Sequence, residues 1–288
     1  MSIARRTLLK VSLILALAAC SYPGVRGVSP ESPRPSATPT VSRSRPTHPP
    51  TETTAPATAA VPLPEERPEE AIMILAPGPG SRLTSPIEVR GVADPTFEQA
   101  LVARLVDTSG EILTEGPLTI QAPLGERGPF DGPIEFAVSE QTNVFLQVYA
   151  TSPRDGGTTH LETVGGGITL LPGGTEEITE RDPYPERIVI AKPQAGQQLS
   201  GGVIHVEGFG TASFEGTLVL ELYDLEGALL DSQPIIVDSP DMGTPGLFSG
   251  EVTFSISEPM PARLVVRDPL PVSNGVNHIA SVEVRLQP

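Results

Sequence analysis

Two stretches of this chain repeat each other. The first consists of Phe97-Glu98, a strand-like segment and Asp107-Thr108-Ser109-Gly110, and the second of Phe214-Glu215, a similar segment and Asp224-Leu225-Glu226-Gly227. In both copies the last glycine follows the phenylalanine by thirteen residues. A repeat of this kind predicts two copies of one structural unit.

The segments around both copies alternate apolar and polar residues, which is typical of half-buried strands. Another glycine, Gly91 or Gly208, ends the alternating run before each phenylalanine. About seven such strands in roughly 100 residues, with turns between them, predict an all-β fold of two tandem immunoglobulin-like β-sandwich domains. The expected core positions are Leu101, Ala103, Leu105, Phe130, Ile134, Phe136, Val138, Val144, Leu146 and Val148, matched by Leu218, Leu220, Leu222, Phe248, Val252, Phe254, Ile256, Ala262, Leu264 and Val266.

Composition divides the chain into five segments. Residues 1–19 have the pattern of a signal peptide, and residues 20–70 are rich in Pro, Ser and Thr with almost no large apolar side chains. Such a segment cannot bury a core, so we expect a disordered stalk. The first sandwich is expected at 71–172 and the second at 187–288, and the polar linker 173–186 between them should allow limited bending.

Both units share one order of motifs: Pro-x-x-Gly, a strand ending in Gly, Phe-Glu, a strand, Asp-x-x-Gly and Phe-x5-Phe. This order resembles the immunoglobulin-like domain family associated with bacterial spore germination, over residues 72–171 and 188–286. The resemblance implies a secreted or lipid-anchored bacterial protein and carries over no catalytic residues. The Cys…Trp…Cys pattern of antibody domains is absent, so any relation to those domains is architectural.

The N-terminus resembles a bacterial lipoprotein signal. Arg5, Arg6 and Lys10 precede the apolar run 11–19, which is too short to span a bilayer. The run ends in Leu17-Ala18-Ala19-Cys20, and in such signals the cysteine is acylated after cleavage. We therefore expect a lipid anchor at Cys20 on the extracytoplasmic face of the cell membrane. An ordinary secretory signal is the alternative, and the paired arginines leave the general secretory and twin-arginine routes both open.

Charge and cysteine content exclude several classes of function. The formal net charge is −16, so nucleic acid is not an expected partner. A single cysteine excludes an intramolecular disulfide and the cysteine-rich zinc spacings.

Residues that could carry chemistry are scattered. Ser139, Ser213 and Ser255 lie in no Gly-x-Ser-x-Gly motif. His160, His205 and His278 are single and widely spaced, and the position of His205 corresponds to Glu88 in the first repeat. We therefore expect the histidines to be solvated bystanders, and we predict no catalytic residue, no cofactor and no metal site.

Two weaker alternatives concern acidic residues. Asp238 and Asp241, with Asp131 or Asp155, could supply oxygen ligands to calcium, but ordinary turn chemistry explains them as well. Glu98 and Glu215 follow the repeated phenylalanines; we expect their carboxylates to accept backbone N–H bonds in the turn.

The repeats differ most on one outward face. Phe145, Gln147 and Tyr149 alternate with core residues there, and the second unit has Arg263 and Arg267 at the positions of the first and last. Two aromatic side chains on an outward strand face could form a binding patch. The alternative is that a loop or the other domain covers this face, where an aromatic ring could stack on an arginine.

Taken together, these features predict a non-enzymatic cell-surface lipoprotein. Its two domains would bind an envelope protein or a cell-wall glycan. A passive structural spacer or assembly subunit is the second interpretation. A hydrolase that uses Asp or Glu is the third, and no catalytic constellation supports it.

Overall fold

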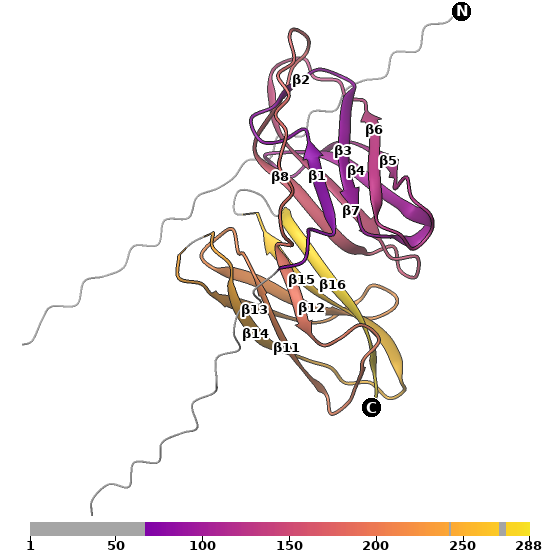
Figure 1. Ribbon diagram of the computed structural model, residues 1–288. Helices are drawn as coiled ribbons and strands as arrows, with labels where there is room; N and C mark the ends of the chain where they lie inside the picture. The colour runs from indigo at the N-terminus through magenta and orange to yellow at the C-terminus, as the bar shows by residue number, and fades with distance from the viewer. Residues whose placement is uncertain (1–66, 242, 271–274) are drawn as a thin grey trace, which may run out of the picture. The chain divides into compact units, whose positions relative to one another are not determined.

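Strands form nearly all the regular structure of the computed structural model (Figure 1). The structure describes residues 67–241, 243–270 and 275–288. The predicted signal peptide, Cys20 and almost all of the predicted stalk lie outside these residues. The described residues belong to one compact unit, and none of their helices is long and apolar enough to cross a membrane.

The first half of the described chain contains eight strands and one 3-10 turn. They are β1 (Ile72–Ala76), β2 (Arg82–Leu83), β3 (Ile87–Ala93), η1 (Phe97–Gln99), β4 (Ala100–Asp107), β5 (Ile112–Thr119), β6 (Gly128–Ile134), β7 (Thr142–Thr151) and β8 (Thr158–Leu170). Sheet β1-β3-β6 and the strands β5-β4-β7-β8 enclose one apolar core.

The second half repeats this arrangement. Its strands are β9 (Ile188–Lys192), β10 (Gln198–Leu199), β11 (Val203–Gly210), β12 (Thr217–Tyr223), β13 (Leu229–Asp238), β14 (Gly246–Thr253), β15 (Met260–Pro269) and β16 (Val276–Leu286). Strands β9-β11-β14 and β13-β12-β15-β16 enclose a second core, and β13 pairs with strands of both layers.

These observations confirm the predicted all-β, immunoglobulin-like sandwich fold. The predicted core strands are buried as expected: Leu101, Ala103 and Leu105 are at most 2% exposed, and Leu218, Leu220 and Leu222 are fully buried. The alternation of the sequence has therefore placed the same side chains inward in both halves, because side chains of a strand point to opposite faces in turn.

The repeated glycines are required by an aromatic ring packed on them. Gly91 pairs with Phe130 across β3 and β6, and Gly208 pairs with Phe248 across β11 and β14. A Cβ atom at position 91 would lie 2.4 Å from the Phe130 ring, and one at position 208 would lie 2.3 Å from the Phe248 ring. Only glycine leaves room for the ring.

The predicted Asp-x-x-Gly turns are confirmed, and the carboxylate is their organising group. Asp107 accepts hydrogen bonds from the backbone N–H groups of Ser109 and Glu111 at 2.8 and 2.9 Å. Asp224 accepts the equivalent bonds from Glu226 and Ala228 at 2.9 and 2.7 Å. The glycine that ends each turn has a positive φ.

The prediction that the carboxylates of Glu98 and Glu215 accept backbone N–H bonds in the turn is wrong. Glu98 and Glu215 have φ angles of 56° and 49°, and the next residues, Gln99 and Gly216, have 57° and 66°. Among the described residues, neither Glu98 nor Glu215 has a side-chain hydrogen bond to the backbone. At both copies of the motif the backbone turns through two residues with positive φ, which is rare for residues with a side chain.

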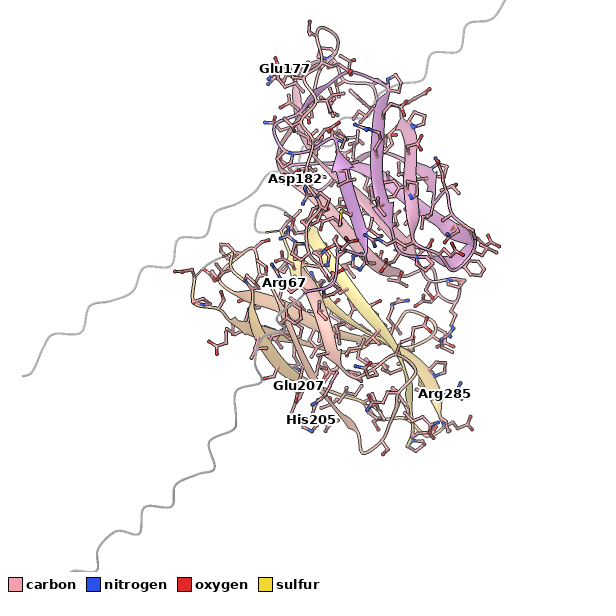
Figure 2. All side chains as sticks on the ribbon, viewed as in Figure 1. Arg67, Glu177, Asp182, His205, Glu207 and Arg285 are labelled. Atoms are coloured by element: carbon pink, nitrogen blue, oxygen red, sulfur yellow. The ribbon has the colours of Figure 1, made fainter. Side chains whose placement is uncertain are left out.

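The predicted linker is bound to the first sandwich along much of its length. Thr179 accepts a backbone hydrogen bond from Gly78 at 2.8 Å, and Arg181 donates one to Leu75 at 2.8 Å. Glu177 exchanges backbone bonds with Arg82 at 2.8 and 2.9 Å. Glu177 and Asp182 are labelled in Figure 2.

Strands β8 and β16 pair with each other, which makes one continuous sheet from strands of both sandwiches. The pairing is antiparallel, with His278 opposite Glu162 and Ile279 opposite Leu161. Leu161, Val265 and Ile279 form a third apolar cluster beside this pairing.

Candidate functional site

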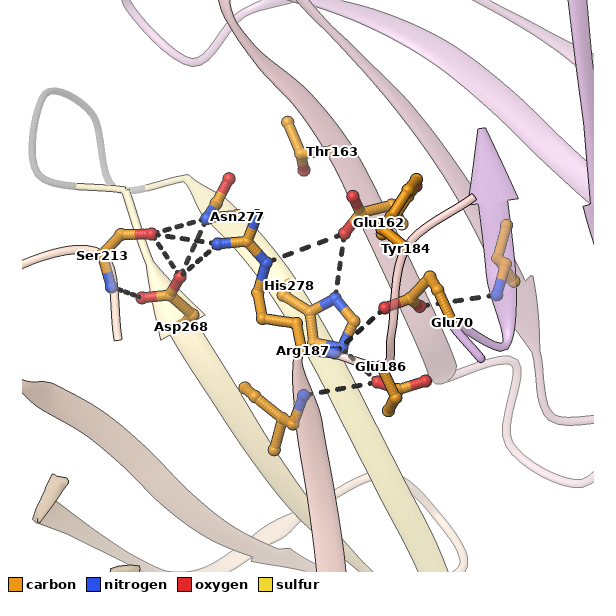
Figure 3. A network of polar contacts seen from close by, with 12 residues as sticks. Glu70, Glu162, Thr163, Tyr184, Glu186, Arg187, Ser213, Asp268, Asn277 and His278 are labelled. Atoms are coloured by element: carbon orange, nitrogen blue, oxygen red, sulfur yellow. Dashed lines mark hydrogen bonds and ion pairs between the residues drawn. The ribbon is translucent and has the colours of Figure 1, made fainter. Parts of the chain in front are cut away.

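A network of buried polar side chains surrounds the β8–β16 pairing (Figure 3). Its acidic members are Glu70 before β1, Glu162 on β8, Glu186 before β9 and Asp268 on β15, and all four are at most 6% exposed. Buried carboxylates are stable only with hydrogen bonds or opposite charges around them. We therefore take this group of buried carboxylates and their partners as the candidate functional site.

His278 on β16 lies at the centre of the network and is fully buried. Its Nδ1 atom is 3.1 Å from Oε2 of Glu162, and its Nε2 atom is 2.9 Å from Oε1 of Glu186. Burial alone would lower the pKa of His278, but the charge of Glu70 and the bonds to Glu162 and Glu186 raise this pKa to about 10. The imidazole is therefore a cation held between carboxylates.

The acidic partners of His278 respond in the opposite direction. Burial acts to raise the pKa of Glu186, but the hydrogen bond with His278 and the nearby histidine charges lower it to about 2. Burial likewise opposes ionisation of Glu162, and its bond to His278 and the nearby arginines hold its pKa below the ordinary value. Both groups are ionised at neutral pH.

His160 on β8 completes a cluster of four. Its Nε2 atom is 2.6 Å from Oε1 of Glu70 and 3.9 Å from Oε2 of Glu186. The rings of His160 and His278 meet edge to face with centroids 4.9 Å apart. One ligand atom from each of Glu70, His160, Glu186 and His278 can be chosen so that all four lie within 4.8 Å of one another.

The cluster consists of two copies of one pair. Glu70 precedes Ile72 on β1 as Glu186 precedes Ile188 on β9, and His160 precedes Leu161 as His278 precedes Ile279. The backbone bonds obey the same relation, because the N–H of Ala71 donates to Glu186 at 2.9 Å and that of Arg187 donates to Glu70 at 3.2 Å. Each glutamate therefore accepts a backbone hydrogen bond from the residue that follows the other glutamate.

This arrangement corrects the expectation for the histidines. We expected His160 and His278 to be solvated, and the structure buries His278 completely and leaves the His160 side chain 14% exposed. The repeat does reproduce them, because they occupy equivalent positions on the last strands of the two units. The sequence carries this equivalence, since His160-Leu161 in the first repeat corresponds to His278-Ile279 in the second.

Arginines balance the other two carboxylates. Arg181 is 3.3 Å from Glu162, and Arg187 is 3.9 Å from Glu162 and 3.7 Å from Asp268. The Arg181 guanidinium also lies 3.8 Å from the centre of the Tyr184 ring, and burial raises the pKa of Tyr184. Ser213, one of the scattered serines, donates to Asp268 at 2.5 Å and has no histidine partner among the described contacts.

The aromatic half of the predicted binding face is partly covered. Gln147 is 2% exposed and donates to the carbonyl of Val276 at 2.6 Å. Phe145 and Tyr149 are half-buried. Tyr149 packs against the third apolar cluster and lies 4.8 Å from the guanidinium of Arg104, on the neighbouring strand of the same unit.

The arginine half is engaged as well. Arg263 is 6% exposed and forms a two-pronged ion pair with Asp155 of the first unit, at 2.7 Å for both contacts. Arg267 pairs with Glu221 at 2.8 Å. The five residues therefore do not form one open surface, because the second unit and local ion pairs occupy much of this face.

The remaining candidates are distributed elsewhere. His205 on β11 is exposed and pairs with Glu251 at 2.9 Å (Figure 2). Asp131 accepts a bond from Gln121, whereas Asp155 is committed to Arg263. Asp131 and Asp155 each have a protein partner of their own.

Fold and site together define an immunoglobulin-like β-sandwich protein with a buried polar junction. Residues 71–157 match the family model described as "Immunoglobulin-like domain of bacterial spore germination". A comparison with curated proteins found no significant match.

The similarity of this chain to solved structures is weak. A red sea bream transglutaminase aligns at 11% identity over 76% of this chain and 31% of its own, with a TM-score of 0.26. The dimeric latent PorU of Porphyromonas gingivalis aligns at 12% identity over 76% and 24%, with a TM-score of 0.24. Bovine butyrophilin aligns at 12% over 75% and 99%, with a TM-score of 0.22. The chain thus spans about a third and a quarter of the first two proteins.

Proposed function

We propose that this protein is a non-enzymatic cell-surface lipoprotein, anchored through Cys20 on the extracytoplasmic face of the cell membrane, that binds an envelope protein or a cell-wall glycan. The match of residues 71–157 supports a binding or structural role rather than a catalytic one. The lipoprotein-like sequence Leu17-Ala18-Ala19-Cys20 supports the location. We further propose that 71–172 and 187–288 are tandem domains of the same family.

The observation that carries a binding role is the repeated exposure of one phenylalanine. Phe97 is 58% exposed and Phe214 is 49% exposed, although both are large and apolar. Each begins the left-handed turn of its unit, with Glu98 and Glu215 at positive φ. Two equivalent exposed aromatic side chains are the kind of anchor that interfaces use, and two linked contact points strengthen binding through effective concentration.

A second pair of exposed apolar side chains recurs in the same way. Ile112 and Leu113 on β5 are 47% and 39% exposed, and Leu229 and Leu230 on β13 are 52% and 37% exposed. Each pair begins two residues after the glycine that ends the Asp-x-x-Gly turn of its unit. A recurrent exposed apolar feature marks an interaction surface better than a single residue does.

Cross-linking on intact cells tests this proposal. The anchored chain is compared with Cys20→Ala and with the double variant Phe97→Ser/Phe214→Ser, and captured partners are identified by mass spectrometry. We expect one stoichiometric protein or glycan partner with the native chain and its loss in the double variant. Leu124→Ser/Ile178→Ser is the matched control, because Leu124 and Ile178 are 77% and 55% exposed but are not repeated.

The shared β8–β16 sheet favours a second candidate, a structural spacer. A spacer needs a fixed relation between its units, and strand pairing with a buried polar junction supplies one. In this case the Phe97→Ser/Phe214→Ser variant retains every contact of the native chain. Capture of the same partner in equal amount by native and variant chains would therefore replace the binding proposal with this one.

A further inference from the structure

The cluster of Glu70, His160, Glu186 and His278 has the composition of a zinc site. Imidazole nitrogen and carboxylate oxygen are both ordinary zinc ligands, and structural zinc sites are four-coordinate and tetrahedral. Calcium and magnesium instead prefer sites made of oxygen alone. Two nitrogens and two oxygens thus select zinc or a similar first-row transition metal.

The distances suit a tetrahedral ion after small adjustments. Ligand bonds of about 2.0–2.2 Å place neighbouring ligand atoms roughly 3.3–3.5 Å apart. His160 Nε2 and Glu70 Oε1 are now 2.6 Å apart, His278 Nε2 and Glu186 Oε1 are 2.9 Å apart, and all four ligand atoms lie within 4.8 Å. The two short separations must widen by about 0.4–0.9 Å, and a separation as long as 4.8 Å must shorten by about 1.3–1.5 Å, to reach the tetrahedral value.

The surrounding contacts orient the ligands as metal sites require. Metal-binding histidines usually donate their second ring N–H to a carboxylate, which fixes the tautomer. Glu162 occupies that position, 3.1 Å from Nδ1 of His278. The Glu70 and Glu186 carboxylates are each held by a backbone N–H from the opposite unit.

Charge separates this cluster from the rest of the network. Glu162 and Asp268 have arginine partners, whereas the ion-pair partners of Glu70 and Glu186 among the described residues are the two histidines alone. Zinc binding releases the proton that His278 carries in the metal-free chain, because an imidazole nitrogen must be unprotonated to bind a metal. The four groups then carry a charge of −2, which a divalent ion balances. Access is also present, because a surface cleft of about 350 Å³ is lined by both His160 and Glu186.

We propose that His160 and His278, through their Nε2 atoms, and one carboxylate oxygen each from Glu70 and Glu186 bind a single zinc ion that links the two immunoglobulin-like units. Each Glu–His pair consists of a histidine on the last strand of one unit and the glutamate two residues before the first strand of that unit, so neither pair forms the site alone. Glu162 acts as a positioning residue through His278. The ion joins the paired strands β8 and β16 at the place where they meet.

Isothermal titration of the purified, tag-free full chain with ZnCl2 tests the proposal. The chain has four histidines, so His48→Ala/His205→Ala removes every histidine outside the cluster and leaves the cluster intact. We expect one zinc ion per chain for both the native chain and this double variant. Cobalt(II) bound in place of zinc should give the visible absorption of a tetrahedral site.

Variants within the cluster complete the test. His160→Ala removes a partly exposed ligand, and we expect an affinity loss of at least about 100-fold, while Glu162→Gln loses about 10–100-fold. Far-UV circular dichroism checks that each variant is folded. Zinc binding that is absent from the native chain, unchanged in His160→Ala, lost in His48→Ala/His205→Ala, or matched in affinity by calcium would overturn the proposal.

Discussion

The two Glu–His pairs are equivalent in sequence but differ in their surroundings. His278 is fully buried and faces Glu162 across the strand pairing, whereas the His160 side chain is 14% exposed and borders a cleft. The position that corresponds to Glu162 in the second unit is Ala280. His278 therefore has a carboxylate opposite it across the strand pairing, and His160 has no equivalent carboxylate from the second unit.

The largest effect should separate these two histidines. In metal-free buffer with chelator, His278→Ala removes the buried cation that lies between Glu162 and Glu186. This change should lower the free energy of unfolding by about 3–5 kcal/mol. His160→Ala should cost about 1–2 kcal/mol, because water can reach the freed carboxylate of Glu70. Urea denaturation measures both. Equal losses in the free energy of unfolding would show that the different surroundings of His278 and His160 do not affect stability.

The next effect concerns the ion pair that crosses between the units. Asp155→Asn leaves the buried guanidinium of Arg263 without its counter-charge and should cost about 3 kcal/mol. The bond from Arg263 outweighs burial and lowers the pKa of Asp155 below its ordinary value of 3.8. The contribution of the carboxylate is thus complete above pH 3.8 and is lost as the pH falls through the lower folded-state pKa.

Urea denaturation at several pH values checks this second prediction. The stability difference between the native chain and Asp155→Asn should be constant at neutral pH and shrink below pH 3.8. Arg267→Gln is the control, since its partner Glu221 lies in the same unit. A difference that persists unchanged at the lowest pH would contradict the assigned role of Asp155.

Equivalent substitutions in the cores of the two units, away from the β8–β16 pairing, should destabilise the protein by similar amounts. Gly91→Ala and Gly208→Ala each push a methyl group into a phenylalanine ring and a carbonyl oxygen, with contacts of 2.1–2.4 Å. Overpacking of this kind should cost about 1–3 kcal/mol in either unit. Thermal unfolding by calorimetry compares them, and a large effect in only one unit would mean that the equivalence of the cores is superficial.

The smallest effect on stability is expected for His205, which belongs to neither Glu–His pair. The side chains of His205 and Glu251 are 73% and 62% exposed, and exposed ion pairs contribute at most about 1 kcal/mol. His205→Ala should therefore change the midpoint of urea denaturation very little. A loss as large as that of His160→Ala would remove the distinction between the paired and unpaired histidines.

Much of the fold could be predicted from the repeated motif. Alternation identified the strands because a sheet buried on one face needs apolar side chains at every second position, and the aspartate and glycine of the turns have local roles. The site was harder to predict. The Glu–His pairs could have been found by aligning β1 with β9 and β8 with β16, but nothing local indicated that they meet.

The sequence by itself determined which side chains each sandwich buries and where its turns lie, because these depend on contacts within one unit. Only the tertiary structure decided that β8 pairs with β16, that Arg263 meets Asp155, and that Gln147 is covered. The physical reason is that strand edges carry similar backbone donors and acceptors, so the choice of partner edge depends on the packing of the whole unit. The same pairing brings two distant Glu–His pairs into one cluster.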